Sequence, residues 1–207
     1  MSQITKKVRG RPRAFEEGAV LASARDAFWS RGLAGVSLDQ IAAKTGVARP
    51  SLAAVFGDKR ALYLNTIDDF MRELEKAAET LMSGRGELRA ELTAFFRGAV
   101  DLYLSGSEPR GCMAICTLPV EAVHDDQIRT HLANILAATD TVFTNRFRLA
   151  RAQGQFPKGQ SMTAHGALAA ALLHSVAIRA RAGAPKASLH AMIKSALDVI
   201  CGQRAVR

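Results

Sequence analysis

The sequence predicts an all-α protein of about nine helices. Three observations support this prediction. Signals for β-strands are almost absent from the chain. Apolar residues recur every three to four positions over long stretches, which is the period of an amphipathic helix. Glycine, proline and aspartate fall between these stretches, where they end one helix or begin the next.

The first two predicted helices are separated by a short turn. Residues 14–31 form the first helix, whose apolar residues fall on one face: Val20, Ala24 and Phe28. Gly32 follows, at the position where a helix C-terminus favours glycine. Ser37 begins a short second helix, and Gln40 lies three residues later, as a capping box requires. Both ends of this turn are therefore defined by local sequence.

A third short helix, residues 49–56, follows after a tight turn, and Pro50 is tolerated in its first turn. Gly46 can take the left-handed conformation that a sharp turn requires, and Val47 fills the angle between the helices. A short helix, a turn and a second short helix form the layout of a helix-turn-helix motif. In such a motif the second helix places its N-terminal side chains in the major groove of DNA.

Two longer helices come next. Asp58 caps a helix that begins at Lys59 and runs to about residue 82. Its apolar face consists of Tyr63, Ile67, Phe70, Leu74, Ala77 and Leu81. Residues 83–86 form a break rich in glycine. The helix predicted over residues 87–104 carries Leu88, Leu92, Phe95, Ala99 and Leu102 on one side.

Four further helices complete the chain. After a loop at residues 105–111, residues 112–123 form a short helix, or one kinked at Pro119. Residues 125–153 form a long helix whose inward residues are Ile128, Leu132, Ile135, Leu136, Thr139, Phe143 and Phe147. Residues 154–160 are a loop. The last helices, residues 161–182 and 187–202, are separated by glycine, alanine and proline.

The composition is that of a globular protein, with 207 residues, 48% of them apolar and 23% charged. The sequence contains no run of 18 apolar residues, so it predicts no membrane-spanning helix. The basic N-terminus has no apolar stretch behind it, so we expect no signal peptide and a cytoplasmic location. Three cysteines, Cys112, Cys116 and Cys201, argue against a disulfide framework. No constellation of a nucleophile, a metal site or a phosphate loop predicts an enzyme, and we expect no cofactor.

Positive charge is concentrated at the front of the chain. Residues 1–60 carry 11 lysines and arginines against 5 acidic residues, whereas residues 61–207 carry 17 against 14. The first 13 residues hold five of these cations and no acidic residue. A basic front end on a nearly balanced body favours a nucleic-acid partner. The alternative is a solvated tail.

The front of the chain resembles the DNA-binding domain of the TetR family of transcriptional regulators. The matching features, in order, are Ala24, Phe28, Gly32, Ser37, Ile41-Ala42, Gly46-Val47, Ser51-Leu52, Phe56, Lys59 and Leu62. Residues 110–113 and 174–184 are similar to the sixth and eighth helices of one large subgroup. The resemblance is strong at the front and weaker behind.

The resemblance implies a homodimeric repressor that a small molecule releases from double-stranded operator DNA. It implies three parts: a basic arm (1–13), a helix-turn-helix domain (14–72), and a domain for ligand binding and dimerisation (73–207). We expect the homodimer to form through residues 161–182 and 187–202, because small apolar residues let helices approach closely. We expect no membrane partner.

The same resemblance implies which residues meet DNA. Ser37 and Lys59 would contact phosphates, and Arg49 and Ser51 lie on the recognition helix. The arm residues, by analogy with the arms of other regulators, would contact the DNA backbone or the minor groove: Arg9, Arg11 and Arg13. Arg49 could instead be simply solvated, although arginine to guanine is the commonest specific contact.

The recognition helix departs from the family pattern. Ala53 and Val55 stand where members usually have tyrosine and histidine, and Ala48 and Pro50 replace a usual serine and glycine. These departures leave open a helical adaptor that no longer binds DNA. If the protein does bind DNA, a larger share of the affinity should come from the arm, since phosphate contacts dominate affinity.

Candidate effector and thiol sites lie in the larger part. Six residues could line an apolar pocket or could equally be packed core: Phe95, Leu102, Met113, Cys116, Phe143 and Phe147. Cys112, at a helix start near Arg110, is expected to be the more reactive thiol, with Cys116 placed more deeply. A thiol-based redox or electrophile sensor of the same fold is thus an alternative, as is an inert pair of buried cysteines. His124, Asp125 and Asp126 are interpreted as a helix start rather than a metal site.

Overall fold

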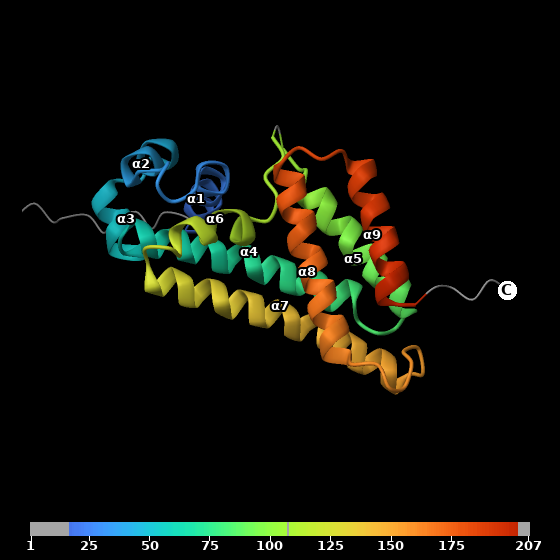
Figure 1. The fold of residues 1–207 in the computed structure, drawn as a ribbon. Coiled ribbons are helices and arrows are strands. Elements are labelled where there is room, and N and C mark those ends of the chain that lie inside the picture. Colours follow the sequence, from blue (N-terminus) through green and yellow to red (C-terminus); the bar gives the residue numbers. More distant parts are fainter. Residues whose placement is uncertain (1–16, 107, 203–207) are drawn as a thin grey trace, which may run out of the picture.

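The computed structural model describes residues 17–106 and 108–202, which form nine α-helices and no strand (Figure 1). The helices are α1 (Glu17–Arg31), α2 (Leu38–Thr45), α3 (Arg49–Phe56), α4 (Lys59–Leu81), α5 (Leu88–Tyr103), α6 (Met113–Glu121), α7 (Asp126–Ala152), α8 (Met162–Arg181) and α9 (Lys186–Ile200). The all-α prediction is confirmed. The predicted start of the first helix at residue 14 and the basic arm lie outside the described residues.

Local sequence determines the ends of the small helices as predicted. The Ser37 hydroxyl accepts the Gln40 N–H at 3.2 Å, and the Gln40 side chain accepts the Ser37 N–H at 3.0 Å. Gly46 ends α2 in the left-handed conformation, with φ 69°. Asp58 caps α4 through a 2.8 Å bond from the Ala61 N–H. These are contacts within one helical turn, which is why the sequence alone indicates them.

Helices α1 to α3 gather at one end of the molecule, around the first turns of α4 (Figure 1). Phe28 of α1 packs edge-on against Tyr63 of α4, with ring centroids 5.2 Å apart. Trp29 does the same against Phe70 at 4.8 Å. Helix α4 continues from this end into the larger part of the molecule, which consists of α5 to α9. One continuous helix therefore joins the helix-turn-helix end to the larger part.

In the larger part, α7 packs closely against α8 (Figure 1). The two helices approach closely at Gly166, where an added Cβ would lie 2.3 Å from Thr144 Oγ1 and 2.7 Å from the Thr144 backbone nitrogen. A glycine is therefore required for this helix spacing.

A buried ion pair ties α5 to α7. Arg146 is 3% exposed, and its Nε donates to Glu91 at 2.7 Å. Glu91 also accepts the N–H groups of Gly84 and Gly86. Burial by itself raises the pKa of Glu91, but these two N–H groups and Arg146 outweigh it, so the pKa lies below its ordinary value. The carboxylate thus stays charged and holds the break after α4 in place.

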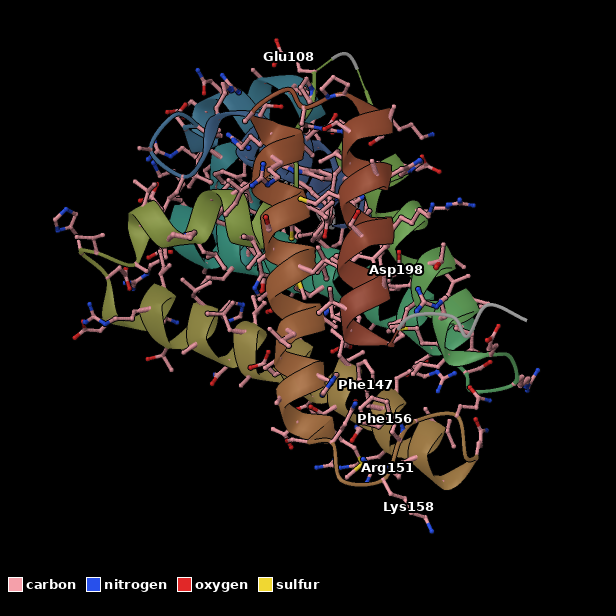
Figure 2. The ribbon with its side chains drawn as sticks, turned by 45° about the vertical axis from the view of Figure 1, so that its right-hand side comes forward. Glu108, Phe147, Arg151, Phe156, Lys158 and Asp198 are labelled. Carbon is pink, nitrogen blue, oxygen red and sulfur yellow. The ribbon has the colours of Figure 1, made fainter. Side chains whose placement is uncertain are left out.

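Two details of the core differ from the predictions. Leu81 is exposed, and the end of α4 buries Ala78 and Met82 instead. The loop at residues 154–160 contributes Phe156 to the core. Its ring packs on Phe147 at 5.1 Å, under the guanidinium of Arg151 (Figure 2).

Candidate DNA-binding interface and ligand cleft

Helix α3 presents a largely apolar outer surface. Its exposed residues are Arg49, Pro50, Ala53, Ala54 and Val55, and Ser51 is half-buried. Leu52 and Phe56 face inward and hold α3 against the domain. Arg49 is thus the single charged residue of α3, at its first turn. Methyl groups on this surface suit apolar contact with thymine methyl groups, and the arginine suits guanine.

Arg49 is already paired in the free protein. Its Nη1 lies 3.2 and 3.3 Å from the two carboxylate oxygens of Asp39 on α2. Both side chains are exposed, so the pair is worth little in stability, roughly 0–1 kcal/mol. The pair does orient the guanidinium across the angle between the two helices.

Two of the other predicted DNA contacts have further roles. The Ser37 oxygen accepts the capping bond of α2, which leaves its own O–H free to donate to a phosphate. The Lys59 ammonium donates to the Leu33 carbonyl at 3.0 Å and is half-buried. Lys59 therefore fixes the α1–α2 turn against α4. Arg9, Arg11 and Arg13 lie outside the described residues.

A polar junction joins the helix-turn-helix end, α1 to α3, to the rest of the molecule. The Trp29 indole N–H donates to the Gly111 carbonyl at 3.0 Å. Arg181 of α8 donates to the carbonyls of Trp29 and Arg110, both at 3.1 Å. Arg110 covers the Trp29 ring at 4.3 Å and pairs with Asp26 at 2.7 Å. Helix α1, the loop before α6 and the end of α8 are thus joined at one point.

An apolar cleft of about 40 Å³ lies between α4 and α7. Its lining is Met71, Leu74, Glu75, Ala78, Phe95, Ala138, Thr139, Val142, Phe143 and Leu173. A wider hollow of about 440 Å³ adjoins it and shares Glu75, Ala78 and Val142 with it. Arg146 lines this hollow, and its Nη1 is buried without a hydrogen-bond partner among the described residues. The two spaces together offer an apolar recess with a polar donor beside it.

The six predicted effector residues do not line one cavity. Phe95 and Phe143 lie together in the cleft, with ring centroids 5.6 Å apart. The other four lie elsewhere: Leu102, Met113, Cys116 and Phe147. Met113 and Phe147 are fully buried core residues. Sequence periodicity missed the α4 side of the cleft, because Leu74 and Ala78 look the same as packed core in the sequence.

The predicted order of depth of the two thiols is wrong. Cys112 does begin α6, but it is buried, and burial raises the pKa of its thiol to about 11 despite the nearby N–H groups of the helix start. Cys116 is the more exposed. Burial raises its pKa as well, and the positive charge of Arg181 partly offsets the increase. The helix-start effect is weak compared with removal of a thiolate from water.

Asp125 and Asp126 lie at the start of α7, as the sequence predicted. Asp125 caps the helix by accepting the N–H groups of Gln127 and Ile128. It also pairs with Arg60 at 2.9 Å, and this hydrogen bond lowers the pKa of Asp125 below its ordinary value. Within the described ranges, no three histidine, cysteine or acidic side chains are grouped so that they could hold a metal ion.

Comparison with known proteins decides the family. Residues 20–66 match the family described as "Bacterial regulatory proteins, tetR family". The chain is 26% identical over 184 residues to the transcriptional repressor ComR of Escherichia coli, covering 88% of each chain. It is similar in fold to a cysteine mutant of the TetR family regulator CifR bound to double-strand operator DNA. The identity is 27%, the TM-score is 0.79, and 90% of this chain and 98% of that chain are covered.

Residues 20–66 thus form a TetR family domain, and the chain as a whole is similar to TetR family regulators. With this N-terminal helix-turn-helix domain it is a transcriptional regulator, and the relatives named here are transcriptional regulators rather than enzymes. The transcriptional activator FasR of Mycolicibacterium smegmatis is 34% identical over 89 residues, covering 41% of each chain. Relatives thus include both repressors and activators. No helix in the described part of the chain is long and apolar enough to cross a membrane.

Proposed function

We propose that the protein is a dimeric repressor that leaves its operator when an apolar effector binds between α4 and α7. The observation that carries the DNA-binding part is the exposed outer face of α3, with Arg49 at its first turn and methyl groups behind it. The direction of regulation follows ComR, the repressor to which the chain is similar over most of its length.

The DNA contact is tested by fluorescence anisotropy with duplexes from upstream of the protein's own gene. Arg49→Ala should relax the sequence preference by roughly 1–3 kcal/mol at one base pair. Removal of residues 1–13, which hold Arg9, Arg11 and Arg13, should flatten the salt dependence by about 0.9 per lost phosphate contact. Lys76→Ala, on α4, is the matched control. If the intact protein bound none of the duplexes, the result would point to the adaptor instead.

The proposed effector site is the apolar cleft with Phe95 and Phe143 on its wall together with the adjoining hollow of about 440 Å³, because the cleft alone is too small for a drug-sized molecule. The dye N-phenyl-1-naphthylamine is a suitable neutral, apolar probe. Ala138→Trp should fill the cleft and abolish dye binding, whereas Ala137→Trp, on the neighbouring exposed position, should not. Saturating dye should also weaken DNA binding by the intact protein. Equal dye binding by both variants would place the site elsewhere.

The outer face of α8 and α9 supports the dimer. Val199 of α9 is exposed. Small and apolar side chains form an exposed stripe along α8: Ala164, Ala167, Leu168, Ala171 and Ile178. Other alanines of α8, including Ala169, Ala170 and Ala177, are buried in the protein's own core. Leu168→Glu with Ile178→Glu should give monomers in sedimentation. Val120→Glu, on α6, should leave the dimer intact.

A thiol-based input is the second candidate, and the structure favours Cys116 over Cys112 for it. The Cys116 sulfur lies 3.7 Å from the Ala177 carbonyl, directly below the junction at Gly111. An adduct at Cys116 would push on α8 beside Arg181. N-ethylmaleimide at pH 8 should therefore label Cys116 before Cys112 and weaken DNA binding. If DNA binding survives full labelling of Cys116, this candidate fails.

A further inference from the structure

A groove on the surface between α5 and α9 is a second candidate binding site. Its volume is about 430 Å³, ten times that of the α4–α7 cleft. Helix α5 contributes Arg89 and Arg97 to it, and α9 contributes Ile193, Lys194, Leu197 and Asp198. The groove thus combines an apolar floor with a charged rim, which is the composition of many sites for small molecules.

The charges of the groove are unequally paired. Arg89 pairs with Asp198 at 2.6 Å at one end, and Lys186 pairs with Asp101 at 2.6 Å beyond the other end. Figure 2 shows Asp198 on α9, beside α5. The remaining carboxylate of these two helices, Glu91, is bound to Arg146. Every carboxylate on α5 and α9 therefore already has a cation.

The two cations between these pairs have no partner. Neither Arg97 nor Lys194 makes an ion pair or a side-chain hydrogen bond within the described residues, and both are exposed. His190 lines the same groove, and its Nε2 is buried without a hydrogen-bond partner in the described structure. Three nitrogen-bearing side chains thus line the same groove as Ile193 and Leu197, both of which are buried.

The groove is separate from the face proposed for the dimer. Lys194 and Val199 are five residues apart on α9, which places them about 140° apart around the helix axis. Lys194 thus faces a different side of α9 from Val199, the residue of α9 assigned to the proposed dimer face.

We propose that this groove binds a small organic anion, a sulfonate or carboxylate on a flat apolar body. The acidic group lies between the Arg97 guanidinium and the Lys194 ammonium, and the apolar body covers Ile193 and Leu197. Arginine offers a planar fork of donors and lysine a compact charge, so together they satisfy several oxygens of one head group. The site does not depend on the α4–α7 cleft or on DNA binding.

The probe is 8-anilinonaphthalene-1-sulfonate, titrated by fluorescence against the full-length protein. N-phenyl-1-naphthylamine has the same rings without the charge. Arg97→Glu with Lys194→Glu should raise the Kd of the sulfonate about tenfold or more and leave that of the neutral dye unchanged. Lys76→Glu with Arg85→Glu makes the same change in net charge away from the groove and should alter the sulfonate Kd less than twofold.

A second variant separates charge from folding. Arg97→Gln with Lys194→Gln removes both charges but keeps a polar side chain at each position, and it should raise the sulfonate Kd to an intermediate value, with an unchanged circular dichroism spectrum. The proposal is overturned if the groove variants change the Kd less than twofold. It is also overturned if the control pair weakens binding equally, or if the neutral dye loses as much affinity as the sulfonate.

Discussion

Helices α8 and α4 contact the rest of the body in different ways. Helix α8 is approached closely at two glycines: Gly166 lies against Thr144 of α7, and Gly111 lies where a Cβ would be 2.4 Å from the Ala177 carbonyl. Helix α4 faces α7 across a cleft instead. Glycine contacts of this kind leave little freedom to slide, because backbone atoms are among the nearest neighbours of each added Cβ. In the proposed mechanism the α4 side is the one that adjusts to the effector, since α4 also packs against the helix-turn-helix end.

The largest effect is expected at Gly111, on the tight side. Gly111→Ala adds a Cβ in a left-handed conformation, with φ 65°, and against a backbone oxygen. Strain and overpacking together should lower the free energy of unfolding by about 3–5 kcal/mol. Gly183→Ala, with φ 82° and open space around it, carries the strain alone. Urea unfolding of both variants measures the difference, and equal losses would contradict a tight contact at Gly111.

Gly166→Ala tests the other tight contact. The added Cβ meets the backbone of Thr144 and should cost about 2–3 kcal/mol, since α7 and α8 must separate. Gly98→Ala in α5 is the control, because its nearest neighbour would be a Leu81 methyl carbon at 3.8 Å. Alanine there should stabilise the helix by about 0.5–1 kcal/mol. Thermal unfolding should move in opposite directions for the two variants; a common direction would show that the helices can yield.

The buried thiol at the start of α6 gives a pH-dependent test, in which stability should change by up to about 2.7 kcal/mol. The pKa of Cys112 is about 11 in the folded protein, against an ordinary value of 9.0. Below pH 9 the thiol is protonated in both states, so the stability is fully present. Between pH 9 and 11 the unfolded chain releases its proton first, and stability falls. Cys112→Ala should therefore lose less stability over this range than the wild type, and parallel curves would contradict the buried position.

The smallest effect is expected on the α4 side. Ala138→Trp fills the cleft rather than displacing backbone, so its free energy of unfolding should stay within about 1 kcal/mol of the wild type. Ala137→Trp, which faces solvent on the same helix, provides the reference. Chemical denaturation of both checks the comparison. A loss near that of Gly166→Ala would mean that α4 and α7 are packed as tightly as α7 and α8.

Local and long-range features differed in how well the sequence predicted them. The Ser37–Gln40 capping box and the turn at Gly46 depend on contacts within a few residues, and both were predictable. The pair between Arg49 and Asp39 depends on the angle between α2 and α3, which the sequence leaves unspecified. Phe156, in a loop, gave no periodic signal and yet is buried.

The candidate sites show the same limit. Phe95 and Phe143 could be named as cleft residues, but Met113 and Phe147 have the same helical spacing and are packed core. Whether an inward residue lines a space depends on how far apart two helices lie, and that distance is a tertiary property. The depth of Cys112 was misjudged for this reason, since the sequence shows the helix start but not what covers it.

The position of Trp29 makes the protein its own fluorescent reporter. It is the one tryptophan in the sequence, and its indole sits at the junction, against Phe70, under Arg110 and bonded to Gly111. Emission excited at the red edge of the indole band therefore comes from this joint alone, without labelling. A blue-shifted, unquenched spectrum belongs to the closed joint, and a red shift with faster acrylamide quenching marks its opening. A ligand or operator duplex that opens this junction would therefore be detected directly by the emission of Trp29, the one tryptophan of the sequence.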